Sequence, residues 1–146
     1  MSSLLKVSEA AALALHAMAC LARRRDGRIP AREIARATRA SPAHLSKVLG
    51  RLERAGLVRG TRGPAGGYAL ARPPQRITLK DIYEQIEGPL GTTPCLFGTP
   101  VCSGPCMLGS LLEDVDERVE EKLRGTRLSD LDVEFRGSGR RPPKGA

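Results

Sequence analysis

Three of the four cysteines lie close together, on a segment that cannot form regular structure. They are Cys95, Cys102 and Cys106, with six and then three residues between them. Residues 88–105 hold four Gly and four Pro, which interrupt helices and strands. Soft thiolates gathered on irregular backbone suit an iron–sulfur cluster, a zinc ion or a redox thiol.

The spacing bears on these three alternatives. Zinc sites usually contain two closely spaced ligand pairs and often histidine, whereas this segment has one such pair and neither histidine of the chain lies near it. Cys106 follows Pro105 and is predicted in the first turn of a long helix, where the helix dipole favours a thiolate. An iron–sulfur cluster is therefore the first interpretation, and a thiol redox switch, zinc or haem is the alternative.

The long helix is predicted to run from 106 to about 124. Its apolar residues recur at close to heptad spacing among acidic and basic side chains: Leu108, Leu111, Leu112, Val115, Val119 and Leu123. We expect this stripe to pair with a second copy, giving a homodimer through residues 106–124. A further helical turn over Leu128–Leu131 and a disordered basic tail over 136–146 are predicted to follow.

A helix-turn-helix is predicted before the cysteines. Residues 4–24 are predicted to form the first helix, in which Leu5, Ala12, Leu15, Ala19 and Ala22 share much of one face, and Asp26-Gly27 ends it. A short helix follows Pro30, and after a very short link a third helix opens at Ser41 and ends at Ala55-Gly56. Two short helices so closely joined, the second amphipathic, make a helix-turn-helix.

The helix from Ser41 has one apolar and one hydrogen-bonding side. Its apolar residues are Leu45, Val48, Leu49 and Leu52, and its polar side carries His44, Ser46, Lys47 and Arg51. Such a helix in a basic protein is a candidate for the DNA major groove. A solvated surface helix is the alternative.

A β-hairpin is predicted after that helix. Residues 57–59 and 68–70 have strand character and flank a glycine-rich stretch. No Lys-Ser or Lys-Thr pair follows the glycines, so a phosphate-binding nucleotide loop is disfavoured. Arg59 and Arg62 on a thin hairpin suit contact with the DNA backbone or minor groove, as in the wing of a winged helix.

Composition agrees with a DNA-binding protein. The 146 residues carry a formal net charge of +8, which favours polyanionic partners. No apolar run reaches membrane-spanning length and no signal peptide is recognisable, so a cytoplasmic protein with reduced thiols is expected. An enzyme is disfavoured, because the sequence contains no paired carboxylates, nucleophile–base set or cofactor motif. A small electron carrier is disfavoured because such proteins are usually acidic and need no wing.

Residues 58–70, placed between the Ser41 helix and three cysteines, resemble the Rrf-type (IscR/NsrR-like) family of winged-helix, iron–sulfur-cluster transcriptional regulators. The most specific part is the wing sequence Arg62-Gly63-Pro64-Ala65-Gly66-Gly67-Tyr68 with Leu70 close behind. The match covers about residues 4–133 in the same element order. The cysteine trio favours a cluster-bearing member.

The resemblance implies a homodimer that binds a near-palindromic double-stranded DNA operator, with the cluster loop against the DNA-binding domain of the partner. Carried over by position, the helix contacts fall on Ala43, His44, Ser46 and Lys47 and the wing contact on Arg62. Cys95, Cys102 and Cys106 would ligate a 2Fe–2S or 4Fe–4S cluster that senses redox state, nitric oxide or iron–sulfur status.

This chain departs from the family pattern at the fourth ligand. The gap between Cys102 and Cys106 is shorter than is common, and Gly109 stands where some members have a histidine. In the nitric-oxide-sensing branch an aspartate of the partner completes the site, and Glu9 is the aligned residue here. Glu9 as plain helix-surface charge is the alternative.

The predicted fold is mainly α with a small β-hairpin wing: a winged helix-turn-helix plus a long C-terminal dimerisation helix. Residues 1–76 form the DNA-binding domain and 77–105 a connecting helix, predicted from Leu79 to Glu87, and the cysteine loop. Residues 106–135 form the dimerisation helix with a short terminal helix, and 136–146 the tail.

Overall fold

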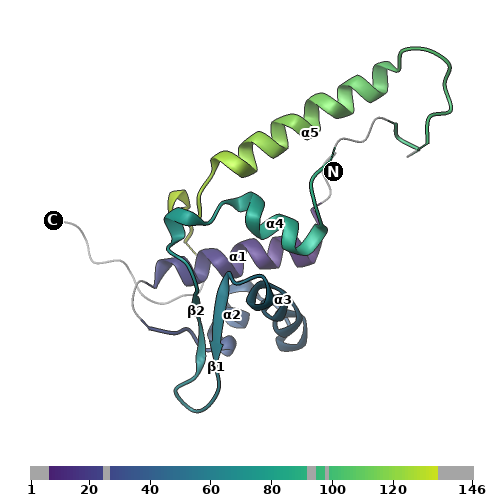
Figure 1. The fold of residues 1–146 in the computed structure, drawn as a ribbon. Coiled ribbons are helices and arrows are strands. Elements are labelled where there is room, and N and C mark those ends of the chain that lie inside the picture. The colour runs from purple at the N-terminus through teal and green to yellow at the C-terminus, as the bar shows by residue number, and fades with distance from the viewer. Residues whose placement is uncertain (1–6, 25–26, 92–94, 98, 135–146) are drawn as a thin grey trace.

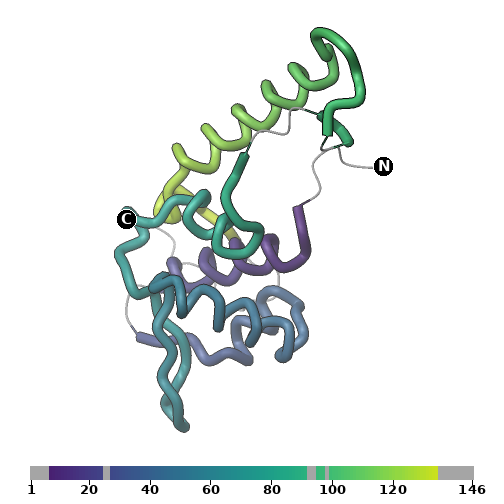
Figure 2. Tube along the Cα trace, turned by 45° about the vertical axis from the view of Figure 1, so that its right-hand side comes forward, coloured from purple at the N-terminus to yellow at the C-terminus, as the bar shows by residue number. Residues whose placement is uncertain are grey.

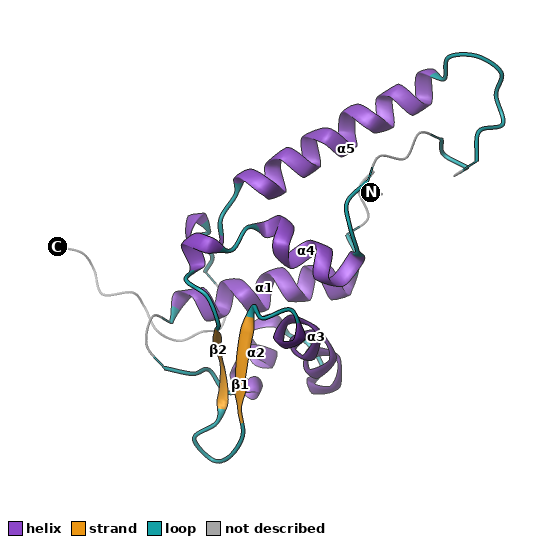
Figure 3. Cartoon of the chain, in the orientation of Figure 1, coloured by secondary structure: helices purple, strands orange, loops and turns teal. Residues whose placement is uncertain are grey.

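The computed structural model describes residues 7–24, 27–91, 95–97 and 99–134. Figure 1 shows a cluster of helices with a hairpin at one end. The elements in chain order are α1 (Glu9–Arg23), α2 (Ala31–Thr38), α3 (Pro42–Arg54), β1 (Val58–Thr61), β2 (Gly67–Leu70), the 3-10 turn η1 (Pro74–Arg76), α4 (Leu79–Glu87), α5 (Met107–Gly125) and the 3-10 turn η2 (Leu128–Asp130). The predicted fold class is confirmed, as the secondary-structure view in Figure 3 makes plain.

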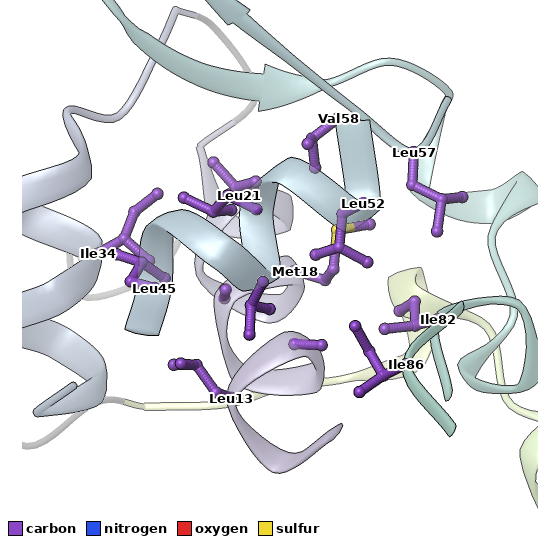
Figure 4. Close-up of a cluster of buried hydrophobic side chains, with 14 of the residues drawn as sticks. Leu13, Met18, Leu21, Ile34, Leu45, Leu52, Leu57, Val58, Ile82 and Ile86 are labelled. Carbon is purple, nitrogen blue, oxygen red and sulfur yellow. The ribbon is translucent and has the colours of Figure 1, made fainter. Parts of the chain in front are cut away.

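Helix α1 is the centre of the hydrophobic core. It packs against α2, α3 and α4, and Figure 4 shows aliphatic side chains from these elements gathered in one cluster. Its fully enclosed residues are Ala11, Ala14, Ala17 and Met18, each 0% exposed. Among the residues predicted to share one face of this helix, Ala19 is buried, and Ala12, Leu15 and Ala22 are half-buried. Leu15 and Ala22 pack against the core. Small alanines let the surrounding helices approach α1 closely.

Local capping groups set the helix starts. The hydroxyl of Ser41 accepts a hydrogen bond from the amide N–H of His44 at 3.2 Å, and Thr78 forms a capping box with Asp81. Helices α3 and α4 therefore begin where the sequence predicts. Helix α1 begins later than predicted, at Glu9 rather than residue 4, because Ser8 accepts the amide of Ala11 at 3.0 Å and so acts as the N-cap.

The hairpin is an antiparallel pair of four-residue strands, with Val58 opposite Leu70 and Thr61 opposite Gly67. Its outer edge on the β2 side is covered by Ile29, whose N–H and C=O both pair with Tyr68 at 2.9 Å. A side chain at Gly67 would meet the Ile29 carbonyl at 2.6 Å. Glycine there is therefore needed for the close pairing between the hairpin and the segment before α2.

The C-terminal end of α5 is fastened to the start of α4 and to the segment just before it. The amide of Leu79 donates to the Thr126 carbonyl at 2.9 Å, and the amide of Leu128 donates to the Ile77 carbonyl at 2.8 Å. Leu128 is fully buried in the core. From this anchor the other end of α5 extends away from α1–α4, on the side opposite the hairpin in both Figure 1 and Figure 2.

The predicted tail over 136–146 lies outside the described residues. In the part of the chain that the structure describes, no helix is long and apolar enough to cross a membrane.

Candidate DNA-binding surface and cysteine segment

The N-terminal half of α3 presents a polar surface. Its apolar residues Leu45, Val48, Leu49 and Leu52 are all buried, which holds the helix in one rotational setting. That setting exposes Ser41, Ala43, Ser46 and Lys47 and leaves His44 half-buried. The predicted two-sided helix is confirmed in its burial pattern.

Arg51 on the same helix contacts a neighbouring helix. Its guanidinium Nη1 donates to the carbonyl oxygen of Ile86 in the last turn of α4, at 3.3 Å. The side chain remains exposed. Arg51 therefore links α3 to α4 in this structure, and a DNA contact from it stays a prediction.

The hairpin lies against α3. The carboxylate of Glu53 in the last turn of α3 accepts the backbone N–H of Gly60 in β1 at 2.9 Å. Arg59 and Arg62 are both exposed on this hairpin. Arg62 also lines a hollow between the hairpin and the start of α2, together with Arg32 and Glu53.

Arg32 and Glu53 were not among the predicted site residues. Arg32 comes from α2, and the pairing of Ile29 with Tyr68 holds the start of that helix beside the hairpin. Glu53 looks like an ordinary exposed charge in the sequence. A basic residue just after the helix-starting Pro30 was a signal for Arg32, whereas no local signal marked Glu53.

All four cysteines are free thiols. Cys95 is buried, with 6% exposure, and its Sγ lies 3.5 Å from the Thr99 carbonyl oxygen. Cys102 is exposed. Burial raises the pKa of the Cys20 thiol in α1, which packs against the core as the small residue that its helix predicts.

Cys106 caps α5 rather than lying within its first turn. Helix α5 begins at Met107, and the Sγ of Cys106 accepts the amide of Gly109 at 3.3 Å. The predicted position was wrong by one residue, because the thiol itself takes the N-cap role that a hydroxyl or carboxylate usually has. Glu9 is exposed at the first position of α1.

The described residues contain no group of three cysteine, histidine or acidic side chains gathered closely enough to hold a metal ion. The donor types nevertheless fit an iron–sulfur cluster, because three unpaired thiols lie on one short irregular segment. Hydrogen bonds from backbone amides to sulfur, as at Cys106, are a known feature of thiolate-held clusters.

A helix-turn-helix followed by a hairpin that packs against its second helix defines a winged-helix DNA-binding protein. The family model Rrf2, described as an iron-dependent transcriptional regulator, matches residues 7–133. The chain belongs to the Rrf2 family of transcriptional regulators, and it is not an enzyme.

Individual relatives support the same assignment. The regulator IscR of Aliivibrio salmonicida is 30% identical over 84% of this chain and 69% of its own length. Among solved structures, CymR (YrzC), the global cysteine regulator of B. subtilis, has a TM-score of 0.74 and 30% identity, covering 87% of this chain and 95% of CymR. The IscR of T. potens has a TM-score of 0.71 and 31% identity, covering 86% and 85%.

Proposed function

We propose that this regulator binds a double-stranded DNA operator as a homodimer, and that an iron–sulfur cluster held by Cys95, Cys102 and Cys106 controls its affinity for the operator. The proposal assigns base contacts to the N-terminal half of α3 and backbone contacts to the hairpin. Such a protein would act in the cytoplasm, where operator DNA and reduced thiols are both found.

The observation that carries the DNA-binding part is the contact between α3 and the hairpin. Because Glu53 on α3 accepts a hydrogen bond from the Gly60 N–H on β1, the hairpin with its exposed arginines lies directly beside the C-terminal end of α3. A helix in the major groove beside a basic hairpin on the backbone is the usual winged-helix arrangement. The proposed contacts are Ser41, Ala43, His44, Ser46, Lys47, Arg51, Arg59 and Arg62.

Exposed apolar side chains support the homodimer. Most of the large exposed hydrophobic residues of the described chain fall between positions 96 and 111: Leu96 62%, Phe97 78%, Val101 67%, Met107 88%, Leu108 56% and Leu111 56%. Soluble monomers rarely expose so many together. A second copy packed along α5, over residues 106–124, would cover Met107, Leu108 and Leu111 and place two α3 helices about 34 Å apart, one turn of DNA.

The three thiols support the cofactor. A bound cluster would supply a redox-active and nitric-oxide-reactive iron centre. Cys106 would connect that centre to the N-terminus of the dimer helix, and Cys95 and Cys102 would hold it on the preceding segment. The fourth ligand would be Glu9 of the partner subunit.

The position of the cysteine segment favours control through the dimer. Within one chain this segment and the hairpin are at opposite ends (Figures 1 and 2). A change at the cysteines would therefore reach a DNA-binding surface most directly across the interface with the second copy, or along α5 to its anchor at Thr126 and Leu128.

Anaerobic purification of the full chain tests the cofactor. We expect a coloured protein with visible absorbance and matching amounts of iron and sulfide, and we expect Cys102→Ser to lose that absorbance. Cys20→Ser is the matched control and should retain it, because Cys20 lies in α1 and packs against the core. A colourless wild-type protein without iron or sulfide would contradict the cluster.

A thiol redox switch is the second candidate, with zinc or haem as further alternatives for the same cysteines. The observation that favours it is the exposure of Cys102 as a free thiol close in sequence to Cys106. In that case the colourless protein would form a disulfide on mild oxidation, detectable by mass spectrometry, and its DNA affinity would change with that bond.

A further inference from the structure

The amide of Gly60 lies on the free edge of the hairpin. Tyr68, opposite Gly60, uses its own N–H and C=O to pair with Ile29. In an antiparallel ladder, residues opposite one another that turn their polar groups outward form a non-hydrogen-bonded pair. The Gly60 N–H therefore faces away from β2. It donates a hydrogen bond to the Glu53 carboxylate, with 2.9 Å between the nitrogen and Oε1.

The residues around Glu53 and Gly60 determine where the two partners of this hydrogen bond lie. Glu53 lies in the last turn of α3, whose opposite side is fixed in the core by Leu49 and Leu52. A side chain at position 60 would lie 3.1 Å from the Glu53 Oε1 and 3.1 Å from the Tyr68 ring. Glycine at position 60 thus leaves room for both the Tyr68 ring and the Glu53 carboxylate to approach the strand closely.

The charge of Glu53 works against DNA binding. The carboxylate lines the same hollow as Arg32 and Arg62, on a chain of formal net charge +8. A negative group on a surface that meets phosphates lowers the affinity for any DNA. A role that requires a hydrogen-bond acceptor at this position accounts for a carboxylate there.

We propose that Glu53 is a positioning residue for operator recognition. It fixes the angle of the hairpin against α3 through Gly60, so that Lys47 on the helix and Arg62 on the hairpin engage one duplex at the same time. This inference rests on the proposed DNA-binding surface and adds to it a residue that determines specificity without touching DNA.

Two charge-matched pairs of full-length variants separate the hydrogen bond from the charge. Wild type and Glu53→Asp carry the same charge, but Asp withdraws the carboxylate by about 1.5 Å, one C–C bond, and loses the contact. Glu53→Gln and Glu53→Ala both lack the charge, and only Gln keeps an acceptor. The probes are a duplex selected from a random library on the wild-type protein and a scrambled duplex of equal length.

We expect loss of the contact to weaken binding to the selected duplex by about fivefold. This holds for Glu53→Asp compared with wild type and for Glu53→Ala compared with Glu53→Gln. The scrambled duplex should change by less than about twofold within each pair, because its binding depends mainly on charge. Between the pairs, removal of the charge should strengthen binding to both duplexes. Equal affinity of wild type and Glu53→Asp, together with equal affinity of Glu53→Gln and Glu53→Ala, would overturn the inference.

Amide hydrogen exchange at Gly60 gives a readout that is independent of DNA. Exchange should accelerate in Glu53→Asp and Glu53→Ala and stay at the wild-type rate in Glu53→Gln. Identical rates in all four proteins would also overturn the inference. Lys47→Ala and Arg62→Ala test the proposed surface separately: if neither weakens binding to the selected duplex, that surface is wrong whatever the Glu53 variants do.

Discussion

At the scale of single residues, exposure separates the four thiols. Burial disfavours the charged thiolate and raises the pKa of Cys20, so its thiol is protonated at neutral pH. Cys102 is exposed, whereas Cys95 is buried. These differences give the cysteine segment and α1 distinct chemical reactivities.

Alkylation of the metal-free protein with iodoacetamide should therefore modify Cys102 first and Cys20 and Cys95 much more slowly. The rate at Cys20 should rise as the pH increases, because more thiolate then forms. Peptide mapping by mass spectrometry measures each site. Modification of Cys20 as fast as Cys102 at neutral pH would contradict the burial of the α1 thiol.

A second prediction for a single residue concerns the charge of Arg62 on the hairpin. Arg62→Ala removes one cation from the exposed hairpin, so it should weaken binding to selected and scrambled duplexes alike and lower the slope of log affinity against log salt by about 1. Arg124→Ala is the matched control, because it removes the same charge from the last turn of α5, where the Arg124 side chain is 61% exposed. Equal effects of the two substitutions in fluorescence-anisotropy titrations would contradict a wing contact.

At the scale of elements, an ion pair joins α4 to α5. The Lys80 ammonium donates to the Glu120 carboxylate at 2.6 Å, which lowers the pKa of Glu120 and raises that of Lys80. The stabilisation from Glu120 is present above its ordinary pKa of 4.5 and is lost as the pH falls through the lowered folded value. The stabilisation from Lys80 is present below 10.5 and is lost as the pH rises through its raised folded value.

Glu120→Gln should accordingly lower the free energy of unfolding at neutral pH, and the difference from wild type should shrink at pH values well below 4.5. Urea denaturation at the two pH values measures it. Glu121→Gln is the control, since the adjacent Glu121 is exposed on the same helix. A neutral-pH loss for Glu120→Gln no larger than for Glu121→Gln would show that the pair does not fasten α5.

Local signals predicted most elements, and long-range contacts explain what the sequence could not predict. Ser41, Thr78 and Gly56 mark helix boundaries through hydrogen bonds or backbone angles within a few residues, so α3 and α4 were predicted correctly. The enclosed residues of α1, such as Ala14 and Met18, were not predicted, because their burial depends on three helices that come later in the chain. The Glu53–Gly60 and Lys80–Glu120 contacts likewise join elements whose relative placement no local pattern encodes.

At the scale of the whole molecule, the exposed residues Leu108 and Leu111 predict self-association. Burial of a leucine side chain contributes about 1.5–3 kcal/mol, less where it is already half-covered. Replacement of both by Arg should raise the dimer dissociation constant by at least about tenfold. Sedimentation velocity measures this, with the exposed neighbour Ser110→Arg as control. Double-variant dimers as stable as wild type would place the interface elsewhere.

The proposed dimer would also link the two halves of the proposed mechanism, because the cysteine segment and the hairpin lie at opposite ends of the chain (Figure 2). The most direct test is the affinity of anaerobically purified protein for its selected duplex before and after reaction with nitric oxide, followed by anisotropy with the visible spectrum recorded in parallel. The account predicts that loss of the cluster absorbance and a change in DNA affinity of at least about tenfold occur together, and that Cys102→Ser shows neither response. A coloured wild-type protein whose affinity stays constant while its absorbance disappears would contradict it.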